Sequence, residues 1–196
     1  MHGRTDAALP RLTARHLANL SDTIFGVAMT LLATTLLPSV DALTGSALQM
    51  LSALRAPLTG VALSFGISAL YWMSQHRRLL VTDELTSGQI FLHLLFLLLI
   101  VLLPLSTELA ERSATVAAAV VVYGLHLTLI AALNLALWIG VRRQPGAHTA
   151  IMPSALAVVM LAGSVVVGET RPELATYFWY ATLALPLLSR IGQRFA

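Results

Sequence analysis

An aspartate inside an apolar stretch is the residue whose chemistry most needs explaining. Asp22 follows Ser21 in a segment of the chain that is otherwise apolar enough to cross a bilayer. An unpaired carboxylate in the hydrocarbon is costly, so an acid in such a place marks a polar contact or a functional site. Two interpretations stay open here. Asp22 caps a helix N-terminus at the membrane interface, or it takes part in a buried network between helices.

Possible partners for this carboxylate lie in the segment YWMSQHRR at residues 71–78. Trp72 and His76 are four residues apart, so on a helix they share one face. An indole N–H and an imidazole N–H both donate hydrogen bonds to carboxylates. The alternative is an aromatic belt at the membrane interface, and for Tyr71 that is the better interpretation.

No constellation of residues in the sequence predicts catalysis or metal binding. His93 and His126 have no carboxylate at ligand spacing, so we predict that they are packing residues and not metal ligands. The chain has no cysteine. It also lacks the His-Glu-x-x-His, Gly-x-Ser-x-Gly and phosphate-loop patterns. We therefore predict that the protein is not an enzyme and needs no cofactor.

A stripe of apolar and hydroxyl side chains follows Asp22. With Val27 at 0° and 100° per residue, Thr30 falls at about −60°, Leu31 at +40° and Thr34 at −20°. The stripe extends over about 10 Å of helix, and Asp22 lies about 140° away from it, toward protein packing. The stripe could line an ion pathway, or it could be a helix–helix contact, in which threonine is common.

The composition of the chain is that of a membrane protein. Hydrophobic residues make up 57% of the chain and charged residues 11%, against about 25% charged in soluble domains. Six stretches are long enough to span a bilayer, at residues 17–37, 58–75, 87–106, 114–141, 151–167 and 174–191. Residues 46–56 form an amphipathic lead-in to the second stretch. We predict an all-α polytopic protein with a single domain over residues 1–196 and a short cytoplasmic segment over about residues 1–15.

Charges alternate between the two sides of these spans. One side collects Arg4, Arg11, Arg15, Arg77, Arg78, Arg142, Arg143, Arg190 and Arg194. The other side has Arg55, Arg112 and Arg171 together with the acidic residues Asp41, Glu108, Glu111, Glu169 and Glu173. Cytoplasmic loops carry the excess of positive charge, so both termini are expected in the cytoplasm. Arginines placed in this way explain the pI near 10 without a nucleic-acid partner.

The Ser21-Asp22 pair belongs to a longer pattern. Residues 20–32 read LSDTIFGVAMTLL, residues 71–77 read YWMSQHR and residues 102–107 read LLPLST. In the same order, these resemble the Phe-Ser-Asp, Tyr-Trp…His-His-Arg and Leu-Leu-Pro-Phe-Ser-Thr segments of the transmembrane protein 175 family. That family comprises the potassium channels of endosomes and lysosomes and their prokaryotic relatives. The resemblance covers about residues 15–140, and His93 and His126 stand where the family pattern has asparagine.

The resemblance implies a homotetramer in which four copies of the first helix surround a central pore. Val27 would then form the main hydrophobic constriction and Leu31 a second ring. Thr30 and Thr34 would add rings of hydroxyls. Ser21 and Asp22 would hold the first helix against Trp72 and His76.

The function implied is that of a leak-type cation channel of a bacterial plasma membrane, weakly to moderately selective for potassium and also permeable to protons. Its partners would be the lipid bilayer, monovalent cations and three further copies of the chain, with the permeant potassium ion in place of any cofactor. The alternative is a small secondary cation transporter, which would place its site at a repeat interface near the bilayer midplane.

Overall fold

The protein is described here from a computed structural model that covers residues 8–36, 46–82, 85–113 and 116–194, with the side chains of residues 8–14, 56 and 185–194 left out. The described part is helical. Its elements are α1 (Ala8–Leu32), the 3₁₀ helix η1 (Ala33–Leu36), α2 (Ala47–Leu80), α3 (Ser87–Arg112), α4 (Ala117–Gly140), α5 (Ala147–Gly168) and α6 (Pro172–Arg194).

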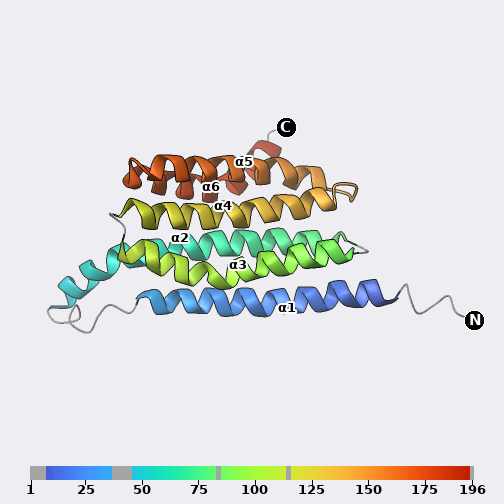
Figure 1. Ribbon diagram of the computed structural model, residues 1–196, viewed down its shortest axis with the longest axis horizontal. Coiled ribbons are helices and arrows are strands. Elements are labelled where there is room, and N and C mark those ends of the chain that lie inside the picture. Colours follow the sequence, from blue (N-terminus) through green and yellow to red (C-terminus); the bar gives the residue numbers. More distant parts are fainter. Residues whose placement is uncertain (1–7, 37–45, 83–84, 114–115, 195–196) are drawn as a thin grey trace, which may run out of the picture.

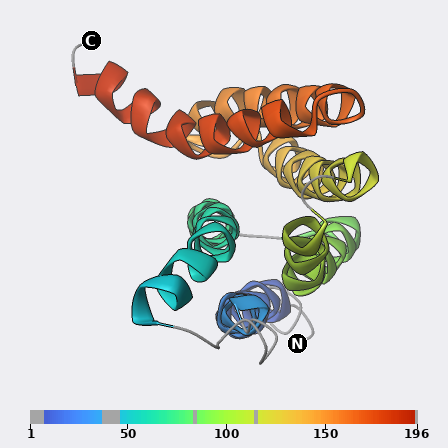
Figure 2. The same ribbon diagram turned by 90° about the vertical axis from the view of Figure 1, so that its left-hand side faces the viewer.

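α1, α3, α4 and the long part of α2 run roughly along the long axis of the molecule (Figure 1), whereas α6 is inclined to it (Figure 2). α1 packs against α2 and α3, and α4 lies between α3 and α5. α6 packs mainly on α5, and its C-terminal end projects to one side of the bundle (Figure 2).

Membrane-spanning length is reached by several of these helices. Among the described residues, four segments are long and apolar enough to cross a bilayer, namely Arg15–Leu36, Ser87–Arg112, Ala117–Gly140 and Ala147–Gly168. α2 adds a fifth if its two bent halves are counted as one span. The predicted class, an all-helical protein with membrane-spanning segments, is therefore confirmed.

Capping residues explain where α2 and α3 begin. At each start a hydroxyl, Ser46 or Thr86, accepts from the backbone N–H of Gln49 or Gln89, and the glutamine side chain accepts from the backbone N–H of the capping residue. This reciprocal arrangement satisfies backbone donors that the first turn of a helix leaves free. The predicted lead-in is thus the first part of α2, and the helix bends by 43° between Ala47–Arg55 and Pro57–Leu80. Pro57 explains the bend, because proline lacks the N–H that would continue the helical ladder.

The first helix differs from the predicted span at both ends. α1 already begins at Ala8, within the segment predicted to be polar and cytoplasmic, and it tightens into η1 from Ala33. Residues 1–7, the predicted stop at Pro38 and the acidic Asp41 lie outside the described residues. The early start matters for Asp22, which is therefore well inside the helix.

Aromatic residues of α1, α2 and α3 meet in the core. Phe96 is fully buried and lies 6.1 Å, centroid to centroid, from both Phe25 and Tyr71. Tyr71 is 8% exposed, so its assignment to an interfacial belt was wrong. Its helix turns the ring toward α3, where it meets the edge of Phe96 at 76°.

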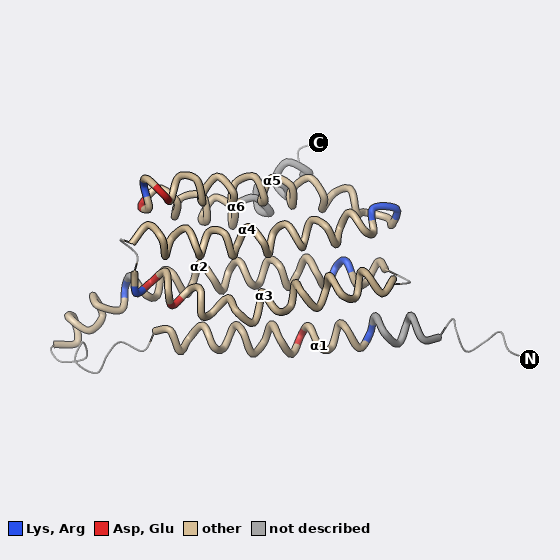
Figure 3. Tube along the Cα trace, in the orientation of Figure 1, with Lys and Arg blue, Asp and Glu red and all other residues tan. Residues whose placement is uncertain are grey.

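Charged residues gather at the two ends of the bundle (Figure 3). At the end where the chain starts, the described part has arginines in the last turn of α2 and after α4. At the opposite end, the acidic residues of α3 and of the α5–α6 connection lie together with Arg55, Arg112 and Arg171. We call these the N-terminal end and the far end. The division agrees with the alternation seen in the sequence.

Replacing Phe96 should show how much the packing of Phe96 against Phe25 and Tyr71 contributes to the stability of the protein. Phe96→Ala removes a ring with no exposed surface, so we expect the purified protein to lose about 3 kcal/mol of stability or more. Thermal unfolding in detergent measures the loss. Phe91→Ala is the matched control on the same helix, because Phe91 is 67% exposed. Equal melting temperatures for the two variants would contradict this packing.

Candidate functional site

One face of α1 is buried against the rest of the chain and the opposite face is uncovered. The buried face consists of Leu17, Ser21, Phe25, Ala28 and Leu32, spaced by three or four residues. On the other side, Val27 is 53% exposed and Leu31 is 43% exposed. Thr30 and Thr34 are exposed as well. The structure thus places the four residues of the predicted stripe together on a face that none of the described helices of the same chain covers.

The uncovered stripe contains more residues than the four predicted from the sequence. Leu20 and Thr23 are also exposed, and at 100° per residue they fall within about 40° of Val27. The signal that identifies them was available in the sequence, because they precede Val27 by seven and four residues. The stripe therefore comprises Leu20, Thr23, Val27, Thr30, Leu31 and Thr34.

The threonines of the stripe turn their oxygens, and not their protons, outward. The Thr30 hydroxyl donates to the carbonyl of Val27, and the Thr34 hydroxyl donates to the carbonyl of Leu31, both at 2.7 Å. Since each hydroxyl has one proton and two lone pairs, the lone pairs are left for partners outside the helix. The two threonines therefore offer hydrogen-bond acceptors on the uncovered face.

Asp22 binds α2. The Trp72 indole Nε1–H donates to Asp22 Oδ1 at 2.8 Å, and the His76 ring stacks on Trp72 with centroids 5.8 Å apart. The interpretation of Asp22 as a helix cap is excluded, because α1 (Ala8–Leu32) begins several turns earlier. Asp22 is exposed in the single chain, so its hydrogen bond with Trp72 lies at the surface of the subunit.

Ser21 does not join Trp72 and His76. Its hydroxyl donates to the carbonyl of Leu17 at 2.6 Å and lies 2.9 Å from Nε2 of His93 on α3. Arg78 Nη2 lies 3.5 Å from the other ring nitrogen of His93. A guanidinium only donates, so Nδ1 must be the acceptor and Nε2 must carry the proton that His93 donates to Ser21. His93 is therefore a neutral packing residue that links α1 to α2 and α3.

This link continues into a buried polar network across the subunit. Arg78 is 2% exposed and donates to Oδ1 of Asn134 at 3.1 Å. Ser74 donates to the same oxygen at 3.0 Å, and it accepts from the Trp138 indole at 2.8 Å. The guanidinium of Arg78 also lies 5.8 Å from the centroid of the Trp138 ring, a favourable cation–π position. The network joins α1, α2, α3 and α4 near the N-terminal end.

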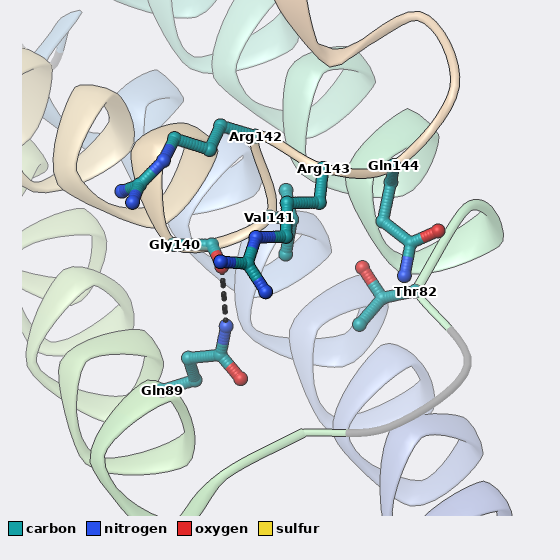
Figure 4. A pocket seen from close by; sticks show the side chains of 7 residues that line it. All are labelled: Thr82, Gln89, Gly140, Val141, Arg142, Arg143 and Gln144. Atoms are coloured by element: carbon teal, nitrogen blue, oxygen red, sulfur yellow. Dashed lines mark hydrogen bonds between the residues drawn. The ribbon is translucent and has the colours of Figure 1, made fainter.

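A cavity of about 350 Å³ opens at the N-terminal end, beside the turn between α4 and α5 (Figure 4). Arg142 and Arg143 extend from this turn, and Gln89 Nε2 donates to the carbonyl of Gly140 at 3.1 Å, which ties the start of α3 to the end of α4. Across the described ranges, no group of three histidine, cysteine, aspartate or glutamate side chains is placed to hold a metal ion. His126 instead donates through Nε2 to the carbonyl of Leu99 at 3.0 Å.

Comparisons with known proteins found one matching family model and a similar solved structure. Residues 16–104 match the family model described as endosomal/lysosomal potassium channel TMEM175. A solved structure, described as a lysosomal potassium-selective channel TMEM175 homologue from Chamaesiphon minutus, superposes with a TM-score of 0.80 at 17% identity. The match covers 90% of this chain and 98% of that one. No curated protein sequence matches the chain.

The fold defines a multi-helix protein with membrane-spanning segments, and the solved channel structure shares that fold. The two comparisons then make the assignment specific: the chain is similar to the TMEM175 potassium channels. The resemblance noted in the sequence is confirmed, because the family match includes the Ser21-Asp22 segment and the Trp72 segment.

A double-mutant cycle tests the bond that holds α1 to α2. Asp22→Asn and Trp72→Phe should each lower the stability of the purified protein, and together they should lower it by less than the sum. A hydrogen bond to a charged group contributes about 1.5–3 kcal/mol, and coupling of this kind appears as non-additivity in thermal unfolding.

Ser21→Ala combined with Trp72→Phe is the control cycle. These two changes should add, because Ser21 contacts His93 and not Trp72. Additive losses for Asp22→Asn and Trp72→Phe would show that the carboxylate and the indole do not interact.

Proposed function

We propose that four copies of the chain form a cation channel, with the uncovered stripe of α1 facing a shared central pore. The observation that carries this proposal is the exposure of Val27 and Leu31, 53% and 43%, on a helix whose opposite face is buried. Two large aliphatic residues and several hydroxyls aligned on one uncovered face suit the lining of a narrow pathway. The family to which the chain is similar is a family of potassium channels, which supports the same function.

Val27 is the proposed main constriction. A ring of four valines offers water no hydrogen-bond partner, so a narrow pore at this level empties of water and stops ions without any moving plug. Leu31, one turn further along, forms a second ring of the same kind. A small outward movement or rotation of the α1 helices would wet both rings and open the pore.

Thr30 and Thr34 are the proposed source of a modest preference for potassium. Their outward lone pairs can replace part of the hydration shell of an ion at the constriction. Since potassium gives up water at lower cost than sodium, weak oxygen ligands favour it. Among the described residues of the stripe none is charged, which suits leak-type conduction. A single file of water molecules along the hydroxyls would also conduct protons.

The contacts of α1 set how easily it moves. Asp22 is held by Trp72 on α2, and Ser21 is held by His93 on α3. In the proposed channel, Asp22 is the anchor on one side of a moving helix, and Ser21 is the anchor on the other. By the distribution of arginine we place the N-terminal end in the cytoplasm of a bacterial cell.

Val27→Asn should produce a leaky channel. An amide in place of each valine keeps water in the constriction, and removing about 1.4 kcal/mol from the barrier raises the rate about tenfold. Potassium flux into liposomes that contain the purified protein measures the effect. Val158→Asn is a comparison on α5, away from the stripe. A wild-type flux for Val27→Asn would mean that Val27 does not line the narrow part of the pathway.

Thr30→Ala combined with Thr34→Ala should lower the potassium-to-sodium permeability ratio toward that of free diffusion. The change removes the oxygens that face outward and keeps the aliphatic rings. Reversal potentials under bi-ionic conditions measure the ratio. Thr35→Ala is the matched control, because Thr35 is half-buried and bonds to the carbonyl of Leu32. A ratio that stays the same would place selectivity elsewhere.

Single-channel recording separates this proposal from a carrier. A channel gives unitary current steps in a planar bilayer, whereas a secondary transporter gives none and saturates at a low turnover. Transport without unitary currents would favour the transporter.

A further inference from the structure

A second polar cavity lies at the far end of the bundle, away from the stripe. It has a volume of about 130 Å³ and is lined by residues of α2, α3, α4 and α6. Its polar lining includes Ser64, Thr107, Glu111 and Tyr123, with Trp179 and Tyr180 as aromatic walls. α1 contributes no residue to it, so the cavity belongs to the interior of one subunit.

Glu111 is the acidic group of this cavity. Its carboxylate rests over Gly60 of α2, so closely that a β-carbon at that position would overlap with Oε1. Within the described residues no hydrogen bond or ion pair is recorded for Glu111, whereas the neighbouring acid Glu108 pairs with Arg112 at 2.7 Å. Glu111 is only partly exposed, and a partly buried carboxylate without a partner is unfavourable unless a proton or a cation compensates its charge.

Hydroxyl oxygens face the same space. Thr107 Oγ1 lies 2.9 Å from Ser64 Oγ and 2.8 Å from the carbonyl of Leu103, and Ser64 Oγ lies 2.8 Å from the Tyr123 hydroxyl. These three contacts use the three available hydroxyl protons, so the lone pairs of the oxygens remain for a further partner. All three residues are at most 2% exposed, which holds the oxygens in place.

The indole N–H of the aromatic wall is already used. Trp179 Nε1 donates to Ser164 Oγ at 3.0 Å, and the Trp179 ring meets Tyr123 edge-on with centroids 4.7 Å apart. No arginine lies among the described residues that line the cavity. The cavity at the N-terminal end differs in this respect, because Arg142 and Arg143 line it.

We propose that each subunit binds one monovalent metal cation, partly hydrated, between Glu111 and the Ser64–Thr107–Tyr123 hydroxyls. Carboxylate and hydroxyl oxygens are the ligands that hard cations prefer, and divalent calcium would call for more oxygen ligands than one carboxylate and three hydroxyls supply. A water molecule takes up about 30 Å³ in the liquid, so the cavity has room for an ion and a few waters. The bound ion would neutralise Glu111 and join α2 and α3 to α4 and α6. The proposal does not depend on the pore along α1.

The test is the melting temperature of the full-length protein in lipid nanodiscs as KCl replaces N-methyl-D-glucamine chloride at constant ionic strength. We expect potassium to raise the melting temperature of the wild type and of Glu169→Gln, and to leave Glu111→Gln unchanged. Glu169 is the matched control, because it is an exposed acid at the same end but outside the cavity. A potassium response in Glu111→Gln equal to that of the wild type would overturn the site.

Two further measurements keep the test decisive if Glu111→Gln folds poorly. Tyr123→Phe, which removes one oxygen and no charge, should move the midpoint of the potassium titration several-fold higher. An unchanged midpoint counts against the site. In crystals soaked in rubidium, an anomalous peak in the cavity supports it, and a cavity without a peak at concentrations that saturate the thermal response overturns it.

A last comparison separates this proposal from the proposed channel. The Thr30→Ala, Thr34→Ala double variant should keep the thermal response to potassium, because those residues are not in the cavity. Loss of the response in that variant would show that the ion acts at the stripe and not at Glu111.

Discussion

A bilayer provides no water to polar side chains, and this constraint organises the interior of the protein. The polar groups of the described spans are largely paired with one another: Ser21 with His93, Arg78 with Asn134, and Trp138 with Ser74. Because each bond joins different helices, the pairs also set the rotation of one helix against the next. Arg78 is an example, because burying a guanidinium costs free energy unless acceptors and an aromatic face surround it. Asn134 and the Trp138 ring fill these roles here.

The same constraint gives α1 two different faces. Ser21 and Phe25 commit one face to α3, and Asp22 is held by Trp72 of α2, so the stripe from Leu20 to Thr34 is left uncovered. Thr30 and Thr34 in this stripe donate their hydroxyl protons to backbone carbonyls of the same helix. Such a face can meet lipid, water or another copy of the helix without leaving a hydroxyl proton unpaired, and this suits the proposed pore lining, which must alternate between dry and wet states.

The two ends of the bundle offer ions opposite environments. Arg142 and Arg143 flank the cavity at the N-terminal end, and Glu111 occupies the cavity at the far end. A cation is therefore favoured in the cavity beside Glu111 and disfavoured in the cavity beside Arg142 and Arg143. Both effects fall off over the Debye length of about 8 Å in physiological salt.

The sequence by itself determined the membrane class, the helical segments and the stripe of α1, because hydropathy and the 3.6-residue period are local properties that extend along a helix. It also singled out Asp22 and Trp72 as possible partners. Only the tertiary structure decided that Tyr71 is buried against Phe96, that Ser21 pairs with His93, and that Glu111 lies over Gly60. Partners of this kind depend on how far each helix is rotated and shifted against its neighbours, and on bends such as the one at Pro57, which no periodicity within one segment encodes.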